Sequence, residues 1–302
     1  MENLISSNKG LDGVPHFFKQ DARVQGLPLM SSPLPTLLIL VCYYIFVYYG
    51  RTIMADRKPL QLKRLIMLYN LGMVIFSLYM AKEFAMAGWL TGYQLGCQPI
   101  DYTPRGDRVS TYIRTLLDCC YLKFYDALLN MFGFFQIIFI MKKKFHQLTF
   151  LHLFHHGFLP FNWWFGIKFI PGGWGTFHAF INTLVHSVMY MYYFLSAGGP
   201  AIQKYLWWKK YITTIQIAQF ILVICHTLST FLFVQDCDYP SLAVKLVLFY
   251  NFLFLCLFMD FYIKTYKRKT KPKENDKIVY MNGHGQKVQN GHMENGNAVK
   301  VD

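Results

Sequence analysis

Three histidines stand close together in an otherwise almost wholly apolar stretch, FLHLFHHGFLPFNWWFGIKF at residues 150–169. His152, His155 and His156 form an H-x-x-H-H cluster. On a helix, positions i, i+3 and i+4 project from the same side, so the three imidazoles would share one face. Ionisable groups at membrane depth are expensive and mark functional sites. The cluster is therefore the first candidate for a reactive centre.

Polar side chains also recur at helical spacing in the two apolar stretches that follow the cluster. They are His178, Asn182 and His186 in the first stretch, and Gln216, Gln219 and His226 in the second. Unsatisfied polar groups are costly in lipid. Three neighbouring stretches thus carry groups that need either hydrogen-bond partners or a wet cavity.

Two interpretations of the cluster compete with a catalytic one. A lone buried histidine is often a hydrogen-bonded packing residue, but three on one face, together with His186, make packing the weaker reading. Imidazole clusters also bind iron or zinc, and H-x-x-H-H occurs in two-iron membrane desaturases and hydroxylases, which carry several such boxes. Here one box is present, and His146, His284 and His292 lie in a turn or the tail, so we expect no metal.

The third interpretation is nucleophilic and acid–base chemistry by imidazole itself. A neutral imidazole can attack a thioester to give an acyl-imidazole, and neighbouring imidazoles can move protons. Such an intermediate hydrolyses in water, so an apolar, water-poor site suits it. Burial also favours the neutral imidazole, which is the form that a nucleophile needs.

The composition indicates a membrane protein. Of the 302 residues, 54% are hydrophobic and only 15% are charged, whereas soluble domains carry about 25% charge. The formal net charge of +14 could suggest a nucleic-acid partner. However, the basic residues lie in short groups between apolar runs and in the tail, which is how membrane-flanking charge is arranged. We therefore expect no nucleic-acid partner.

Seven apolar runs are long enough to cross a bilayer. They cover roughly residues 33–50, 65–89, 116–141, 150–170, 174–195, 211–234 and 241–263, and Pro160 interrupts the fourth. We therefore predict an all-α membrane protein with a seven-span catalytic domain at 33–263. Residues 1–32 are mixed and polar, so the first span should insert without a cleaved signal peptide. Residues 264–302 should form a disordered basic tail.

The lysines and arginines near the span ends predict the orientation of the chain. In a seven-span protein, the basic segments at 51–64, 142–144, 196–210 and 264–273 all lie on one side, whereas 235–240 has two Asp and no Lys or Arg. Basic loops face the cytosol, so the C-terminus should be cytosolic and the N-terminus lumenal. Cys97 and Cys237 then fall on the lumenal side, where oxidising conditions permit a disulfide.

Motifs spread over residues 20–265 resemble those of one family. Beside H-x-x-H-H they comprise a box around His186 (Met189, Tyr190, Tyr192, Tyr193), T-x-x-Q-x-x-Q-F at residues 213–220, SSPLP at 31–35 and RKPLQLKR at 57–64. Together they are similar to the very-long-chain fatty-acid elongases of the endoplasmic reticulum membrane. The branch with saturated and monounsaturated substrates is nearest.

The resemblance implies seven helices around a narrow acyl tunnel that opens to the cytosol for CoA. The implied reaction joins a long-chain acyl-CoA and malonyl-CoA to 3-oxoacyl-CoA, with loss of CO2 and CoA and without a cofactor. His155 would take the acyl group, His186 would face it, and His152 and His156 would orient it or handle protons. The implied partners are these two substrates, membrane lipid, other enzymes of the elongation cycle and a second copy of the chain.

The resemblance also implies further residues that contact the tunnel or CoA. They are Asn182, Tyr190, Tyr193, Gln216, Gln219, Lys204, Lys209, Lys210, Lys123 and Asp126. One motif departs from the family pattern K-x-x-E-x-x-D-T, because the matching residues are Lys123, Asp126, Leu129 and Asn130. The span is also longer by about seven residues, or roughly 10 Å of helix. This leaves a catalytically impaired elongase homologue as an alternative, besides a seven-span receptor or lipid-binding membrane protein.

Overall fold

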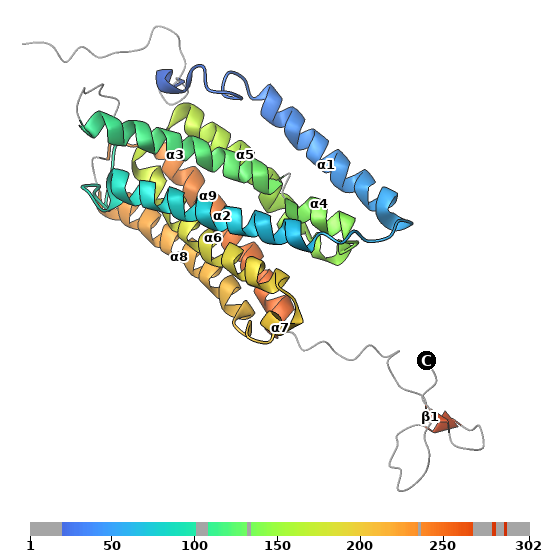
Figure 1. The fold of residues 1–302 in the computed structure, drawn as a ribbon. Coiled ribbons are helices and arrows are strands. Elements are labelled where there is room, and N and C mark those ends of the chain that lie inside the picture. Colours follow the sequence, from blue (N-terminus) through green and yellow to red (C-terminus); the bar gives the residue numbers. More distant parts are fainter. Residues whose placement is uncertain are drawn as a thin grey trace, which may run out of the picture. The chain divides into compact units, whose positions relative to one another are not determined.

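The computed structural model describes residues 20–100, 108–131, 134–234, 237–267, 280–281 and 287–288. The chain divides into two units, Met1–Phe261 and Tyr262–Asp302. Figure 1 shows the long helices: α1 (Leu34–Ala55), α2 (Lys63–Phe84), α3 (Arg108–Met131), α5 (Phe150–Phe169), α6 (Thr176–Ala197), α8 (Lys209–Phe233) and α9 (Ser241–Tyr262), with the shorter α4 (Phe134–Met141) and α7 (Pro200–Gln203).

Short elements complete the described chain. Single helical turns lie at Ala22–Val24, Phe145–Gln147 and Gly173–Gly175, and π-helical turns follow α2 at Ala85–Trp89 and α9 at Ile263–Lys267. In the second unit, β1 (Tyr280–Met281) pairs antiparallel with β2 (Lys287–Val288). The described elements of the first unit are all helical, which agrees with the all-α prediction. Of the predicted disordered tail at 264–302, residues 264–267 belong to the π-helical turn, and the residues other than these and the strand pair lie outside the described residues.

Four helical segments of the described chain are long and apolar enough to cross a membrane. They are Leu34–Ala55, Lys63–Trp89, Lys209–Phe233 and Ser241–Lys267. The helices α3, α5 and α6 have 24, 20 and 22 residues. The structure therefore confirms a helical membrane protein, while the count of seven spans stays a prediction.

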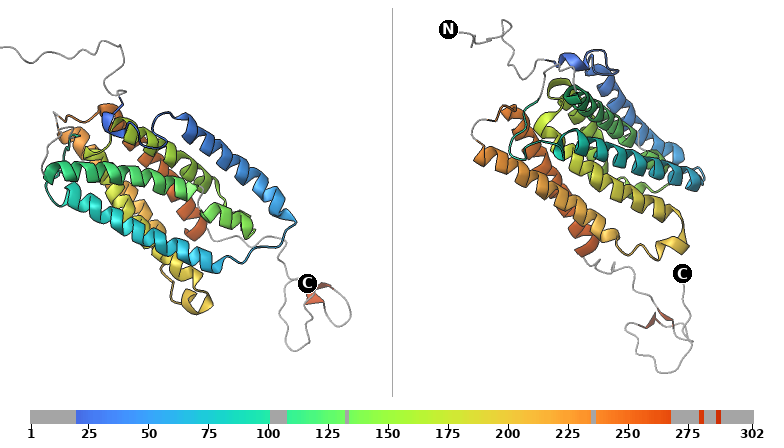
Figure 2. Two further views of the ribbon diagram at one scale, coloured as in Figure 1. Left: turned by 45° about the horizontal axis from the view of Figure 1, so that its top comes forward. Right: turned by 60° about the vertical axis from the view of Figure 1, so that its left-hand side comes forward.

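The helices of the first unit are packed in a closed circuit. Contacts run from α2 to α3, from α3 to α5, and from α6 to both α2 and α8. On α9, Phe254 closes the circuit, because its ring contacts His155 of α5 and Phe220 of α8. Figure 2 shows α1 at the edge of this group, beside α4 and α5. A circuit of this kind lets polar side chains of α3, α5 and α6 meet in its interior.

The third apolar run, predicted as one span at 116–141, comprises the end of α3, described to Met131, and α4, described from Phe134; residues 132–133 lie outside the described residues. The surplus length noticed in the sequence lies in α4. Its end is fastened to the loop after α1, since Leu60 N donates to Met141 O at 2.9 Å and Lys143 Nζ donates to Ala55 O at 2.6 Å.

Helix α5 runs without a break through Pro160, which is a correction to the predicted interruption. A proline lacks the amide that would bond to the carbonyl four residues earlier, here that of His156. The hydroxyl of Thr149 caps the start of α5 by accepting a bond from His152 N at 3.3 Å. Directly after the histidine cluster, Gly157 lets Tyr44 of α1 approach the helix, because a Cβ at residue 157 would overlap the Tyr44 hydroxyl.

Candidate active site

The three clustered histidines form one group of imidazoles on α5. The ring centroids of His152 and His156 are 4.5 Å apart, and those of His155 and His156 are 5.2 Å apart. The helical spacing read from the sequence therefore brings the rings together on one side of the helix. Phe254 and Phe258 of α9 pack edge-on against the His155 ring. The imidazoles thus lie among aromatic rings rather than in water.

Across from the cluster, α3 contributes a buried ion pair. Lys123 Nζ donates to Asp126 Oδ2 at 2.7 Å, and both side chains are only 2% exposed. The same carboxylate oxygen lies 3.8 Å from Nδ1 of His186 on α6. Asp126 therefore stands between a lysine and a histidine that come from two different helices. Buried charges are retained where a partner compensates them.

One small cavity joins these groups. Helices α3, α5 and α6 all line it, and its volume of about 10 Å³ is close to that of a single water site. The lining residues are Lys123, Asp126, Ala127, Asn130, His155, His156, Leu159, Trp163, Asn182 and His186. The structure thus places His155 and His186 on the same cavity. His152 does not line it but contacts the His156 ring.

Asn130 is the centre of a hydrogen-bond network behind the cavity. Its Nδ2 donates to Asp126 O at 2.7 Å and to Asp126 Oδ1 at 2.9 Å. Its Oδ1 accepts from Tyr190 OH, and also from Tyr69 OH at 3.3 Å. Tyr190 is therefore engaged with α3 and does not line the cavity. The sequence did not indicate Tyr69 as a site residue, because its partner Asn130 lies on another helix, far away in the sequence.

The other predicted tunnel residues lie where α6 packs against α8 or against α2. Asn182 Nδ2, at the cavity, donates to Gln219 Oε1 at 3.5 Å. Gln216 Nε2 donates to Met189 Sδ at 3.4 Å. Tyr193 packs beside Tyr190 and Met73 of α2. Of this group, the structure brings only Asn182 to the histidine cavity.

Comparison with known proteins identifies the family. Residues 28–274 match the ELO: GNS1/SUR4 family. The chain is 45% identical over 262 residues to very long chain fatty acid elongase 7 of Rattus norvegicus, covering 84% of this chain and 90% of that protein. It is 43% identical over 267 residues to very long chain fatty acid elongase 1 of Homo sapiens, covering 87% of this chain and 91% of that protein. The chain belongs to the ELO family. The resemblance read from the motifs is thereby confirmed.

The structure shows how the altered ELO motif on α3 is accommodated. Lys123 and Asp126 still form a close ion pair, although the acid is Asp. Asn130 bonds Asp126 and both tyrosines, as described above. Leu129, where the family has an acid, is 52% exposed and does not line the cavity. The lost acid therefore removes no group from the cavity in this member of the ELO family.

The predicted CoA-binding lysines lie near the start of α8. Lys204 Nζ and Lys210 Nζ lie 4.9 and 5.0 Å from the ring centroids of Tyr205 and Tyr211. Lys209 is exposed. At the same end of the bundle, Lys63 Nζ donates to Gly198 O at 2.8 Å and ties the start of α2 to the end of α6. Partial burial and, secondarily, the charge of Lys144 lower the pKa of Lys142 in the turn after α4.

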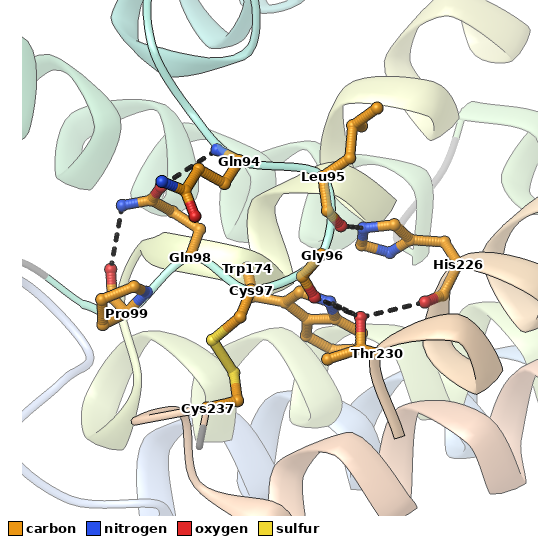
Figure 3. Close-up of a disulfide and its surroundings, with 10 residues drawn as sticks. All are labelled: Gln94, Leu95, Gly96, Cys97, Gln98, Pro99, Trp174, His226, Thr230 and Cys237. Atoms are coloured by element: carbon orange, nitrogen blue, oxygen red, sulfur yellow. Dashed lines mark hydrogen bonds between the residues drawn. A yellow bond between two sulfur atoms is a disulfide. The ribbon is translucent and has the colours of Figure 1, made fainter. Parts of the chain in front are cut away.

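At the opposite ends of α2 and α8, a disulfide joins Cys97 and Cys237 (Figure 3). Beside it, His226 Nε2 lies 2.8 Å from Leu95 O. Thr230 Oγ1 donates to Gly96 O at 2.6 Å and accepts from Trp174 Nε1 at 2.9 Å. The His226 ring stacks on Trp174 at 5.2 Å. His226 is thus a packing histidine with a defined hydrogen-bond partner, far along α8 from the cavity.

Among the described residues, no group of three or more His, Cys, Asp or Glu side chains is arranged to hold a metal ion. The cluster rings instead contact one another and the aromatic rings of α9. Freedom from metal stays a prediction.

Proposed function

We propose that this protein is a condensing enzyme of fatty-acid elongation, which joins a long-chain acyl-CoA and malonyl-CoA to 3-oxoacyl-CoA. The observation that carries the proposal is the cavity on which His155 and His186 meet beside a buried Lys123–Asp126 pair. Membership of the ELO family and the identity of the similar proteins, which are very long chain fatty acid elongases, support the same reaction class.

In the first half-reaction, His155 acts as the nucleophile. A ring nitrogen of His155 attacks the thioester carbonyl, the C–S bond breaks, and the acyl group becomes bonded to the ring. The other ring nitrogen loses its proton, which the leaving CoA thiolate takes up. His156, whose ring touches that of His155, is placed to carry this proton. The aromatic surroundings exclude the water that would hydrolyse the acyl-imidazole.

In the second half-reaction, malonyl-CoA loses CO2 and its C2 carbon attacks the acyl carbonyl. The bond between the carbonyl carbon and the His155 nitrogen breaks, and the freed ring regains one proton from solvent through the neighbouring imidazoles. The Lys123 ammonium is placed to stabilise the negative charge that develops on oxygen, and Asp126 holds this ammonium in position. His186 Nδ1 faces the Asp126 carboxylate at 3.8 Å. His186 is accordingly assigned to orientation and proton transfer, and His152 to support of His156.

The proposed setting is the endoplasmic reticulum membrane, with seven spans, a lumenal N-terminus and a cytosolic C-terminus. The four apolar segments would be joined by α3, α5 and α6 as further spans. The basic residues Lys63 and Lys204 lie at one end of α2 and α8, whereas the Cys97–Cys237 disulfide lies at the other. This separation supports a cytosolic basic side, where CoA would bind, and an oxidising lumenal side.

Turnover of purified protein tests the proposal. The protein in lipid nanodiscs is incubated with long-chain acyl-CoA and radiolabelled malonyl-CoA, and labelled 3-oxoacyl-CoA and CO2 are quantified. We expect both products in equal amounts, with release of one CoA from the acyl donor for each condensation. A protein that binds acyl-CoA and releases no CO2 would instead be a catalytically impaired homologue, and the proposal would fail.

A further inference from the structure

A second cavity lies beyond the histidine cavity along α5. Its volume of about 70 Å³ is larger, and it is lined mainly by the second half of α5, the start of α6 and the first half of α9. Residues such as Phe165, Ile167, Leu246 and Val247 make most of its wall apolar. The catalytic candidates His155 and His186 do not line it. An apolar space of this kind suits a hydrocarbon chain rather than a charged group.

Trp163 is the one described residue that lines both cavities. It follows His156 by seven residues on the same helix, which places it on the same face at roughly 10 Å along the axis. Its ring lies parallel to that of His178, with an interplanar angle of 11° and centroids 6.0 Å apart. His178 is fixed in turn, because its Nδ1 lies 2.9 Å from Tyr250 OH of α9. The indole is therefore held across the boundary between the two spaces.

We propose that Trp163 is a partition that limits the length of acyl chain this protein elongates. The inference rests on the proposed function, because it assumes an acyl group bonded at His155. A short chain attached there would end before the indole. A longer chain would have to displace the indole from its stack on His178 in order to enter the second cavity. Trp163 thus acts on specificity by occupying space, and it is not a catalytic residue.

The neighbouring tryptophan is a natural control. Trp164 is buried, and its Nε1 donates to Leu29 O at 2.9 Å. Its ring lies 4.9 Å from Lys168 Nζ, on a side of α5 that lines neither cavity. The two residues have the same type, adjacent positions and the same helix. If substitution of Trp163 changes the chain-length preference and substitution of Trp164 does not, the change is a local effect on the path of the acyl chain.

The experiment compares elongation of a series of saturated acyl-CoAs by wild type, Trp163→Ala, Trp163→Phe and Trp164→Phe. Monodisperse elution in size-exclusion chromatography and the melting temperature report folding, and kcat/KM is measured for each chain length. For Trp163→Ala we expect kcat/KM on the longest acyl-CoAs to rise about tenfold relative to the shortest, the discrimination that a methylene or two carries in an apolar pocket. Trp163→Phe should shift the preference in the same direction by less, and Trp164→Phe should not shift it.

An unchanged ratio between long and short substrates in both Trp163 variants would overturn the partition, as would an equal loss at every length. If Trp163→Ala does not fold, the Phe variant decides by the same ratio. The two proposals fail in different ways. If the wild type condenses no acyl-CoA, the proposed function is wrong. If the wild type is active and the Trp163 variants have the same chain-length preference as the wild type, only the role of Trp163 as a partition is wrong.

Discussion

Two buried histidine sites in this protein differ in whether their ring nitrogens have hydrogen-bond partners. In the corner beside the disulfide, His226 Nε2 has Leu95 O at 2.8 Å and the ring stacks on Trp174. In the histidine cluster and at the adjoining cavity, His152 Nε2 and His186 Nδ1 are buried and have no hydrogen-bond partner among the described residues. Leaving a buried polar atom unsatisfied costs about 1–3 kcal/mol. We expect the satisfied His226 to serve packing, and the unsatisfied ring nitrogens of His152 and His186 to be available to a ligand or a proton.

The same contrast holds for the covalent and ionic cross-links nearby. Around Cys97 and Cys237, the backbone carbonyls of Leu95 and Gly96 are both bonded to side chains of α8. Around the cavity, Lys123 and Asp126 bury two opposite charges at a place where three helices meet. The region around the disulfide fixes the ends of helices. The region around the cavity keeps two desolvated charges, Lys123 and Asp126, next to imidazoles. Substitutions in the two regions should therefore affect different measurements.

The largest effect on the reaction is expected from His155→Ala. Removing the proposed acyl acceptor should lower kcat for condensation to below about one thousandth of wild type, with the variant still monodisperse. His226→Gln is the matched control on the other side of the comparison. It should lower the melting temperature but retain kcat for each folded molecule. Near-normal turnover by His155→Ala would remove the covalent role of His155.

Breaking the buried ion pair comes next. Asp126→Leu leaves Lys123 buried without its partner, so the variant should lose about 3–5 kcal/mol of stability together with most activity. The double variant Lys123→Met/Asp126→Leu removes both charges and should regain most of the stability. Its kcat should stay low, because the charges beside His186 are absent. Full recovery of kcat in the double variant would show that the pair serves the fold alone. Thermal melting and the condensation assay read the two quantities separately.

Removing the disulfide should affect stability rather than chemistry. The replacement of Cys97 and Cys237 by Ser frees two loops that are 140 residues apart in the sequence. Such a cross-link contributes about 2–4 kcal/mol, so the melting temperature should fall while kcat of the folded fraction is retained. Mass-shift alkylation of the unreduced wild type should leave both thiols unlabelled. Labelling at both positions would contradict the cross-link.

The smallest effect is expected at the basic side near α8. Lys204→Gln with Lys209→Gln should raise KM for acyl-CoA by roughly threefold to tenfold at low ionic strength, and by less in salt, because exposed charges are screened. The value of kcat should stay near wild type. The alternative is that these lysines provide only membrane-flanking charge, and a KM that does not change at any ionic strength would favour it.

Much of this arrangement could be predicted from local sequence. Six of the seven apolar runs correspond to one helix each, such as α5 at Phe150–Phe169, because length and apolar content decide such segments. The shared face of His152, His155 and His156 follows from helical spacing alone. Cys97 and Cys237 could be paired because the orientation predicted from the basic loops puts both in loops on the same side of the membrane.

The other features of the site depend on contacts between helices that are far apart in the sequence, and the spacing of residues within one helix does not predict such contacts. Asn130 meets Tyr69 and Tyr190 only because α2, α3 and α6 pack together. In a chain that is 18% aromatic, neither Trp163 nor Tyr250 stands out as a site residue. Tertiary packing, rather than motif, decides these features.

The most direct test of the account is the mass of the protein after exposure to acyl-CoA in the absence of malonyl-CoA. We predict that a fraction gains one acyl group on the peptide that contains His155, that an equal amount of CoA is released, and that His155→Ala gains none. The same preparation should contain far less than one equivalent of iron or zinc and keep its condensation activity after chelation. An active protein that forms no adduct, or one that holds stoichiometric metal and loses its activity to a chelator, would contradict a histidine nucleophile.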